Sequence, residues 1–341
     1  MRIATYNVEW FDALFDPDGN LLLDDKWSRR RDVTRVQQLE AIAQVFKAMN
    51  ADVVMVIEAP DSSRSRDSAK ALEKFSAHFG LRTRKALMGY ENDTQQEITL
   101  LYDPDLARVQ HDPVGAETGK KGGHDAPRFD GVFRRDLDVD ATPELITFSK
   151  PPLEVALKTK AGNAVRLIGV HIKSKAPHGA NGKAEVMRKA IANRRKQMAQ
   201  CIWLRMRVQQ HLDAGQSVMV LGDFNDGPGL DEYEKLFGRS SVEIVLGENG
   251  QDRLYDPHAE MILKRKLGAK PSSSRFFLRQ EKRYLSVLLD YIMVSADLKA
   301  LEPAWRIWHP FDDPDCYHQP DLRESLLMAS DHFPVSIDIE F

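Results

Sequence analysis

Residues 217–225 read SVMVLGDFN, and this stretch decides the fold. The apolar run from Val218 to Leu221 is typical of a β-strand that is buried on both faces. Two polar residues, Asp223 and Asn225, come directly after the strand. A carboxylate beside a buried strand is costly to desolvate unless it is paired or binds a metal ion. The stretch therefore predicts a buried sheet with chemistry at one of its edges.

Other apolar runs along the chain also have a polar residue at their end, within them or directly before them. These residues are Asn7, Glu58, His171, Asp290, Asp331 and His332. Each has a structural explanation when taken singly, because Asn and Asp are common turn formers and a half-buried histidine needs only a hydrogen-bond partner. Taken together, the placements predict one site that is assembled from several strand ends.

The spacing of apolar residues predicts the main elements. It predicts helices over 28–49, 69–79 and 184–212, and strands over 2–8, 52–57, 82–87, 98–102, 153–159, 165–171, 217–221, 288–294 and 334–340. The stretch 111–141 is rich in Gly, Asp, Pro and His and predicts a long loop. Strands and helices alternate irregularly, which favours a mixed sheet or paired sheets covered by helices.

The composition excludes several classes of protein. The 341 residues include 48 Lys and Arg and 51 Asp and Glu, so the net charge is −3, and 42% of the residues are hydrophobic. The chain is thus neither histone-like nor disordered. Two cysteines, Cys201 and Cys316, cannot make a disulfide framework or a four-cysteine zinc site. No apolar run is long enough to span a membrane, and no apolar signal segment precedes the first strand, so we expect a cytoplasmic protein.

Basic residues are concentrated in two stretches. Residues 173–207 contain ten basic side chains and one acidic, and residues 264–283 contain eight basic and one acidic. Because the net charge is −3, the rest of the chain is acidic overall. The two stretches predict a surface for an anionic substrate, although a solvated helix face and a flexible basic loop explain them equally well.

Six segments, in order, resemble the signature segments of the endonuclease/exonuclease/phosphatase superfamily, which includes deoxyribonuclease I, abasic-site endonucleases, bacterial sphingomyelinases and inositol polyphosphate phosphatases. The segments are Tyr6-Asn7-Val8-Glu9, Ile57-Glu58, Gly169-Val170-His171-Ile172-Lys173-Ser174, Gly222-Asp223-Phe224-Asn225, Leu289-Asp290-Tyr291-Ile292 and Ser330-Asp331-His332-Phe333-Pro334-Val335. The resemblance implies an α/β fold, a four-layer αββα sandwich of two packed mixed β-sheets flanked by helices. It also implies a single domain over 1–341, with surface insertions at 111–141 and 264–283.

The resemblance further implies how the site binds metal and phosphate. Glu58 is expected to be the principal ligand of Mg²⁺ or Mn²⁺, with Asn7 beside it and Asp331 available for a second ion or a bridging water. Asp223 is expected to position the attacking water. Asn225 is expected to hydrogen-bond the phosphate, because an amide can donate where a carboxylate only accepts.

Acid and base chemistry is expected from two histidines, since imidazole titrates near neutral pH. By resemblance, Asp290 orients His332, and Glu97 orients His171. Members that cleave abasic sites generally have tyrosine in place of His171, so the chain looks closer to the deoxyribonucleases and sphingomyelinases.

Two lysines are expected to bind the substrate. Lys150 stands where the family often has a phosphate-clamping arginine, and Lys173 belongs to the segment that contains His171. Lysine provides a point charge rather than a planar fork, so phosphate recognition by Lys150 is expected to be less directional. A second departure is Ile57, which replaces the glutamine that usually precedes the metal-binding glutamate.

Three functions are compatible with the sequence. The first is a metal-dependent nuclease that acts on DNA or RNA, which the two basic stretches favour. Phe276 and Phe277 could then stack on bases, although a role in the core is the commoner one for such residues. The second is a phosphatase or phosphodiesterase acting on a small or lipid-derived phosphoester. The third is a binding module with the same fold, which the intact set of Glu58, Asp223, Asn225 and His332 argues against. The oligomeric state is left open.

Overall fold

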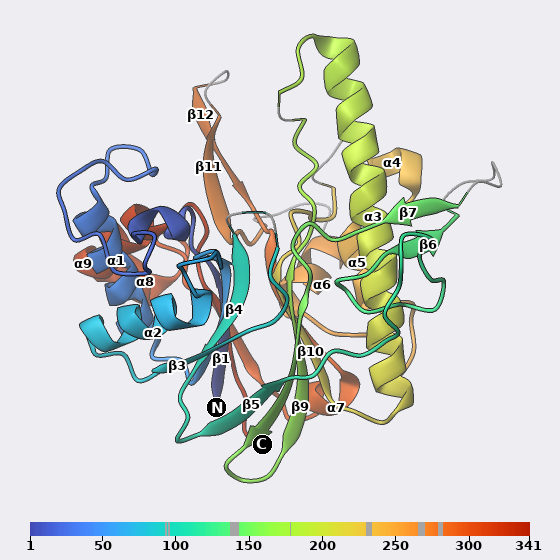
Figure 1. Cartoon of the computed structure of the whole chain (residues 1–341), viewed down its shortest axis with the longest axis horizontal. Coiled ribbons are helices and arrows are strands. Elements are labelled where there is room, and N and C mark those ends of the chain that lie inside the picture. The colour runs from blue at the N-terminus through green and yellow to red at the C-terminus, as the bar shows by residue number, and fades with distance from the viewer. Residues whose placement is uncertain are drawn as a thin grey trace.

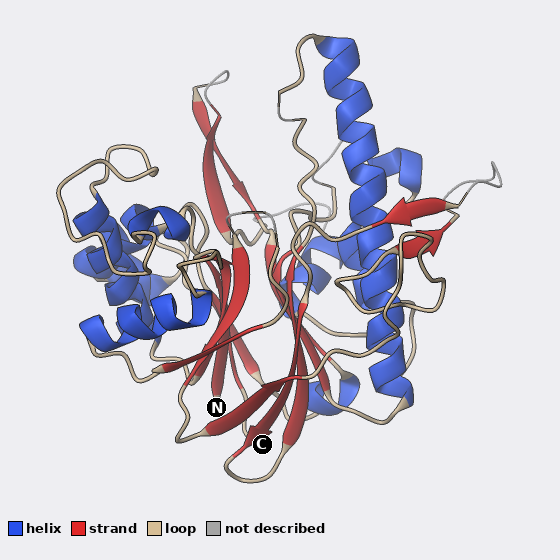
Figure 2. Cartoon of the chain, in the orientation of Figure 1, coloured by secondary structure: helices blue, strands red, loops and turns tan. Residues whose placement is uncertain are grey.

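Two β-sheets stand face to face between two groups of helices (Figure 1). The computed structural model describes residues 1–92, 94, 96–136, 143–177, 179–229, 234–264, 270–278 and 282–341. Colouring by secondary structure shows the strands at the centre and the longer helices on both outer sides (Figure 2). The predicted four-layer α/β sandwich is therefore confirmed.

The first sheet has six strands and contains both the first and the last strand of the chain. Their order is β14 (Ala304–Ile307), β15 (Val335–Asp338), β1 (Arg2–Asn7), β2 (Val53–Ala59), β4 (Glu97–Tyr102) and β3 (Lys85–Met88). Only the β1–β2 pair is parallel, and the other neighbours are antiparallel. Mixed pairing of this kind agrees with the irregular alternation of strands and helices in the sequence.

The second sheet has five strands, again with a single parallel pair, β9–β10. The order is β13 (Asp290–Val294), β10 (Val218–Asp223), β9 (Ala164–His171), β8 (Leu153–Thr159) and β5 (Ala107–His111). The N-terminal halves of β1 and β10 lie away from the projecting elements at the top of Figure 1, so the carboxyl ends of these strands point toward that edge.

Side chains from both sheets fill the space between them. Residues Ile3, Met55, Leu167, Leu221 and Ile292 belong to one buried cluster formed by the facing surfaces of the sheets. Their neighbours along each strand point to the helices, as expected for the two-residue period of β-structure. The alternation fixes which side chains at the strand ends face the other sheet.

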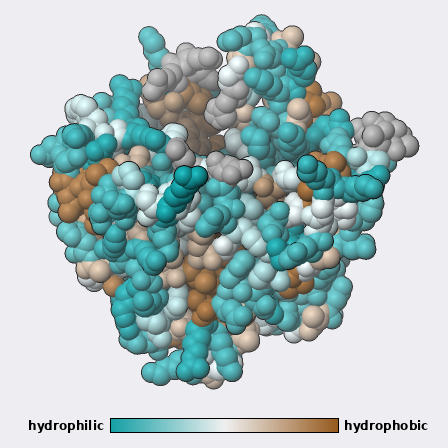
Figure 3. Space-filling view, in the orientation of Figure 1, coloured by the Kyte–Doolittle hydropathy of each residue, from teal (hydrophilic) through white to brown (hydrophobic). Residues whose placement is uncertain are grey.

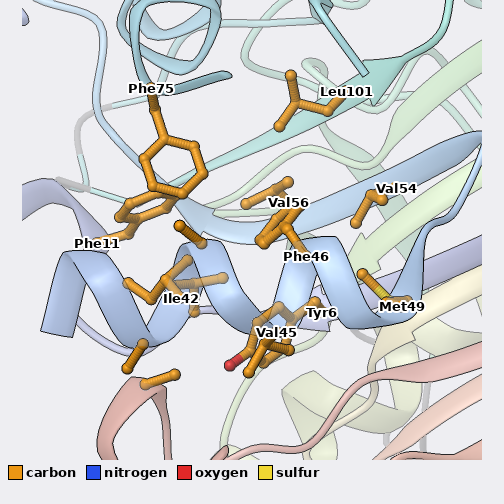
Figure 4. Close-up of a cluster of buried hydrophobic side chains, with 14 of the residues drawn as sticks. Tyr6, Phe11, Ile42, Val45, Phe46, Met49, Val54, Val56, Phe75 and Leu101 are labelled. Atoms are coloured by element: carbon orange, nitrogen blue, oxygen red, sulfur yellow. The ribbon is translucent and has the colours of Figure 1, made fainter. Parts of the chain in front are cut away.

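Four helices and a short 3-10 helix cover the outer face of the first sheet. They are η1 (Phe11–Leu14), α1 (Arg35–Met49), α2 (Ser68–Phe79), α8 (Pro314–His318) and α9 (Pro320–Ala329). Tyr6 of β1 and Val56 of β2 pack there against Phe46 and Phe75, as Figure 4 shows. Sequence spacing predicts a helix over 28–49, but α1 begins at Arg35, because Thr34 and Gln37 form a reciprocal capping box.

The second sheet is covered by a 31-residue helix, α3 (Lys183–Asp213), and by shorter helices. The shorter ones are α4 (Glu234–Phe237), α5 (Ser241–Leu246) and α6 (Pro257–Lys264), whereas α7 (Ala296–Lys299) adds Leu298 to the cluster between the sheets. Trp203 of α3 is fully buried among Phe129, Phe133 and Phe148. The N-terminal turns of α3 extend beyond the strand ends (Figure 1).

Two arginines of the basic stretch 173–207 are part of the protein interior, so neither a substrate-facing surface nor a solvated helix face explains the whole stretch. Arg194 and Arg207 are fully buried. Arg194 donates to Asp226 at 2.9 Å, and Arg207 donates to Glu154 at 2.5 Å. One face of α3 packs on the sheet, so basic residues on that face need buried carboxylate partners.

The two predicted insertions differ in structure. Residues 112–136 form mainly a loop, as predicted, and end in β6 (Phe133–Arg135), which pairs with β7 (Glu144–Ile146) beyond the predicted stretch. Residues 137–142 lie outside the described part. The loop is held by Arg207, which donates to the carbonyls of Ala126 and Pro127. In the second stretch, β11 (Ser274–Leu278) pairs with β12 (Arg283–Val287), and residues 265–269 and 279–281 lie outside the described part.

The single-domain assignment over 1–341 remains a prediction. It is supported by the pairing of β1 with β15, because strands from the two extremes of the chain share one sheet. No helix among the described residues is long and apolar enough to cross a lipid bilayer. The cytoplasmic location also remains a prediction.

The Arg207–Glu154 pair leads to a test of stability. Replacing Arg207 with Met leaves the Glu154 carboxylate buried without its cation, and we expect the free energy of unfolding to fall by about 3–5 kcal/mol. Urea denaturation measures the change. The control is Arg239→Met, which removes a pair with the exposed Glu248 and should change stability by about 0–1 kcal/mol. Equal effects of the two substitutions would contradict the structural role of Arg207.

Candidate active site

The carboxyl end of β10 places Asp223 on the face of its sheet that looks toward the other sheet. Met219 and Leu221 point into the core between the sheets, and Asp223 is the next residue of the same parity. His171 in β9 and Asp290 in β13 are its direct cross-strand partners. Three polar side chains therefore stand in a row at the edge where the apolar core between the sheets ends.

Asp223 lies between two imidazole rings. Its Oδ2 atom is 3.7 Å from Nε2 of His171 and 4.0 Å from Nε2 of His332. The Nδ1 atom of His332 is 2.8 Å from Oδ2 of Asp290, so the predicted pairing of Asp290 with His332 is present. All four residues are buried.

The opposite sheet contributes Asn7. This residue ends β1 with the same parity as Ile3, so its side chain faces the second sheet, and Nδ2 donates to Oδ2 of Asp223 at 3.0 Å. The other amide atom, Oδ1, is buried and has no hydrogen-bond partner among the described residues. An unsatisfied buried oxygen is costly unless a ligand outside the chain meets it.

Glu58 reaches the site because β2 is irregular at this residue. Regular alternation would send Glu58 to the helix side, with Val54 and Val56. The pairing of β2 with β4 shifts register between Ile57 and Ala59, and Glu58 has a left-handed φ of 61°. A β-bulge re-aims the side chain of the extra residue, at a cost in backbone strain that is common at functional sites.

Gln96 connects Glu58 with Lys150, a link that the sequence did not reveal. Its Nε2 donates to Oε2 of Glu58 at 2.6 Å, and its Oε1 accepts from Nζ of Lys150. Lys150 also lies 3.1 Å from Nδ1 of His171. The lysine predicted to clamp phosphate therefore belongs to the same polar network, where burial lowers its pKa although Glu58 and Asp223 oppose the shift.

Asn225 is fixed by a tight turn after β10. Its backbone N–H donates to Oδ1 of Asp223 at 2.7 Å, and its side-chain Nδ2 donates to the carbonyl of Ile172 at 3.1 Å. The left-handed φ of 49° is one that Asn tolerates better than most residues. The turn brings Asn225 next to Asp223, as the GDFN sequence predicts.

The two histidines have opposite electrostatic environments. Burial, followed by the positive charge of Lys150, lowers the pKa of His171 well below its ordinary value. Burial alone would also lower the pKa of His332, but the carboxylates of Asp290, Asp223 and Asp331 raise it well above the ordinary value. At neutral pH, His171 is therefore neutral and His332 is a cation, which divides acid and base capacity between two rings.

The acidic residues also influence one another. Burial raises the pKa of Asp223 to about 7, against the opposing charge of His332. Burial likewise raises the pKa of Asp331 to about 7, with Glu9 and Glu58 adding to the shift. The pKa of Glu58 is raised as well, chiefly by burial. Crowded carboxylates with raised pKa values favour the binding of a cation.

The predicted pairing of Glu97 with His171 is not found among the described residues. Glu97 instead accepts from Nδ2 of Asn92 and from the backbone N–H of Ser62. Burial raises its pKa to about 7. Glu97 forms the bulged pair with Ala59 across β2 and β4, and adjacent side chains of a strand point to opposite faces, so Gln96 takes the place facing Glu58 and Lys150.

Two further residues bear on the sequence predictions. Sequence reasoning missed Ser273, whose hydroxyl donates to Oδ2 of Asp290 at 2.8 Å and accepts from the backbone N–H of Asp290 at 2.9 Å. It lies in a predicted surface insertion, and only the run of three serines at 272–274 marks it in the sequence. Lys173 lies near Lys196, and its role in substrate binding remains a prediction.

The residues present fit a hard divalent cation. The predicted ligands Asn7, Glu58 and Asp331 all offer oxygen, and Oδ1 of Asn7 lacks any partner among the described residues. Among the described histidines, cysteines and acidic residues, Asp223, Asp290 and His332 have ligand atoms within 4.8 Å of one another. In that group, however, His332 is hydrogen-bonded to Asp290 and carries a proton, so it is a poor ligand. The oxygen-only set suits a hard ion better.

A four-layer sandwich whose strand ends converge on carboxylates, an asparagine and two histidines defines a class of phosphoester hydrolases. The chain belongs to the Endonuclease/Exonuclease/phosphatase family, whose model matches residues 4–332. The family resemblance seen in the sequence is thereby confirmed. No curated protein matches the sequence.

Solved structures with the same fold differ widely in sequence. A truncated TDP2 from Caenorhabditis elegans is 14% identical, with a TM-score of 0.51 over 98% of this chain and 96% of that chain. A variant of the 3′ phosphatase NExo from Neisseria, bound to a product DNA hairpin, is 14% identical, with a TM-score of 0.50 over 100% of both chains. At such identities the likeness establishes the fold alone.

Gly222 provides a test of the close approach of β10 to β9. A Cβ at this position would lie 2.0 Å from the carbonyl oxygen of Val170, and φ is 141°. We expect Gly222→Ala to lower the free energy of unfolding by about 2–5 kcal/mol, because backbone must move and the backbone conformation is strained. Gly119→Ala is the control, since nothing lies within 4 Å of its Cβ. Thermal unfolding compares them, and wild-type stability in Gly222→Ala would contradict the described packing.

The charge state of His332 provides a second test. In Asp290→Asn the strongest carboxylate partner is lost while the ring stays buried, so we expect the pKa of His332 to fall from its raised value. An NMR titration of the imidazole resonances measures it. His258, which lies beside Asp256, serves as the internal control and should not change. An unchanged pKa of His332 in this variant would show that Asp290 does not stabilise the protonated ring.

Proposed function

We propose that the protein is a divalent-metal-dependent phosphodiesterase, a nuclease that hydrolyses DNA or RNA backbones by in-line attack of an activated water. The observation that carries the proposal is the position of the site between two basic projections. The N-terminal part of α3 and the β11–β12 hairpin extend past the strand ends on either side of the site (Figure 1). They belong to the two basic stretches, which lie far apart in the sequence.

Basic side chains on both projections are available to a ligand. On α3, Lys183, Arg188 and Lys196 are exposed, and on the hairpin Lys282 is exposed. In the space-filling view, hydrophilic residues cover the upper part of α3, and a recess lies between α3 and the hairpin (Figure 3). Contacts from lysine and arginine to phosphate dominate the affinity of proteins for nucleic acids, so this arrangement supports a polynucleotide substrate.

Each polar side chain of the site has a separate role in hydrolysis. Asp223 accepts hydrogen bonds from Asn7 and Asn225 and is placed to orient the attacking water. His332, held as a cation by Asp290, stabilises negative charge on the phosphoryl oxygens or donates a proton. Neutral His171 and Lys150 contact the phosphate from the other side. Mg²⁺ or Mn²⁺, held by Glu58, Asn7 and Asp331, would neutralise charge on the phosphate and assist the leaving oxygen.

Hydrolysis of a phosphomonoester is the second candidate. The Neisseria structure of the same fold is a 3′ phosphatase bound to a product DNA hairpin. It supports a nucleic-acid ligand, and it also supports a phosphomonoester as the group that is hydrolysed. A small or lipid-derived phosphoester would use the same oxygen ligands and histidines. A binding module without activity has no need for the complete set of Asp223, Asn225, His332 and Glu58.

Cleavage assays test the proposal. With Mg²⁺ or Mn²⁺, we expect turnover of plasmid DNA or RNA that a chelator abolishes. Asp223→Asn and His332→Ala should each lower kcat by roughly 10²- to 10⁴-fold, because each removes a group that orients water or transfers a proton. His318→Ala, which changes an exposed histidine of α8, is the matched control and should keep full activity.

A panel of substrates separates the alternatives in the same experiment. Turnover of monoesters without cleavage of polynucleotides or of a bis-aryl phosphodiester would favour the phosphatase. Absence of turnover with every substrate would favour the binding module. Circular dichroism of each variant ensures that a loss of activity does not reflect unfolding.

A further inference from the structure

A cleft of about 580 Å³ lies next to the site, on the side of Asp331. One wall is the segment that contains Arg30 and Arg31, and the other is the β11–β12 hairpin, which contributes Arg275, Phe277 and Tyr284. A volume of this size falls in the range of pockets for small ligands. Asp331, a predicted metal ligand, belongs to the lining, so the cleft opens directly onto the reacting centre.

Two aromatic rings form an exposed platform in the cleft. Phe277 and Tyr284 are cross-strand partners with ring centroids 5.1 Å apart and ring planes tilted by 58°. Their exposed fractions are 41% and 53%, so neither serves the core, contrary to the commoner role considered for Phe277 from the sequence. A paired, half-exposed aromatic surface beside a charged site is a ready surface for a planar ring.

Arg275 adds an available positive charge. Its guanidinium carbon lies 3.9 Å from the centroid of the Tyr284 ring, and it has no carboxylate partner among the described residues. Arg30 is instead held by Glu9 and by the carbonyl of Leu327, and Arg31 pairs with Asp32. Arg275 is therefore the arginine of the cleft whose donors are left for a phosphate.

The hairpin that carries these groups is tied to the catalytic histidine. The backbone N–H of Arg275 donates to the carbonyl of Asp331 at 2.7 Å, and the Phe276 ring packs edge-on against His332 with centroids 5.5 Å apart. Ser274 and His332 also form an isolated β-bridge. A ligand in the cleft is thus held at a fixed position relative to the phosphate that reacts.

We propose that the cleft binds the nucleotide adjacent to the phosphate that is hydrolysed. The base stacks on the Phe277 ring with the tilted Tyr284 ring at its edge, and a neighbouring phosphate pairs with Arg275, whose guanidinium lies over Tyr284. The inference rests on the proposed nuclease function and extends it, because it makes an unpaired base next to the reacting phosphate a requirement for efficient turnover. Small phosphomonoesters cannot use these contacts, so the cleft would select nucleic acid with accessible bases.

The test removes the rings from the protein and the base from the substrate. The double variant Phe277→Ala/Tyr284→Ala and the wild type are compared on single-stranded oligonucleotides in which one base at a time is replaced by an abasic residue. For the wild type, we expect one position beside the cleaved phosphate where loss of the base lowers kcat/KM roughly 10- to 100-fold. The variant should show a similar loss on the intact oligonucleotide and little further loss on the abasic one.

The matched control is Tyr317→Ala, which removes an exposed tyrosine that also lies near an arginine but does not line the cleft. It should behave as the wild type on both substrates. Arg275→Gln supplies a second readout, because loss of a phosphate contact should lower the slope of log affinity against log salt by about one. Melting curves establish that each variant is folded.

The outcomes separate the two proposals. If the double variant and the abasic residue each lower kcat/KM independently, the two fold-losses multiply. That result would overturn the cleft assignment but not the nuclease function. Failure of the wild type to cleave any oligonucleotide, with turnover of small phosphoesters, would overturn the nuclease function and the cleft assignment together. A base requirement that disappears in the variant would support both.

Discussion

The hydrogen bond from Asn7 to Asp223 joins the two sheets at the point where their shared apolar core ends. Everything else at the site depends on this junction, because the first sheet supplies Asn7 and Glu58 and the second supplies His171, Asp223 and Asp290. The core between the sheets sets their separation, and the strand alternation sets which side chains look across the gap. The packing of the apolar core therefore fixes the positions of the few polar side chains at its edge.

Burial gives this junction its chemistry as well as its geometry. In water, two histidines would titrate alike, but here Lys150 stands beside one ring and three carboxylates surround the other. The two rings consequently adopt opposite charge states at the same pH, although each lies close to Asp223. Burial also raises the pKa values of Glu58 and Asp331, and Oδ1 of Asn7 has no hydrogen-bond partner among the described residues, so this part of the site favours a bound cation.

The spacing of apolar residues predicted mixed or paired sheets covered by helices, and the family resemblance implied the four-layer sandwich and the side chains expected at the strand ends. A run such as VMVLGDFN specifies a buried strand, its end and the polar residues beyond it. The same reasoning failed where a side chain depends on an irregularity or on a distant partner. The bulge at Glu58 decides which residue of β4 faces it, so Gln96 rather than Glu97 joins the network. Charge counts likewise could not show that Arg194 and Arg207 are buried, since their partners lie far along the chain.

The distribution of the site over both extremes of the sequence has a consequence for synthesis of the protein. A ribosome makes Asn7 and Glu58 early, but Asp331 and His332 come more than 270 residues after Glu58. The nascent chain can therefore fold part of its first sheet without acquiring any capacity for hydrolysis. The site is complete only when the segment that carries Asp331 and His332 docks beside β1 through β15, so a chain that stops short of these residues lacks two of the site's polar side chains.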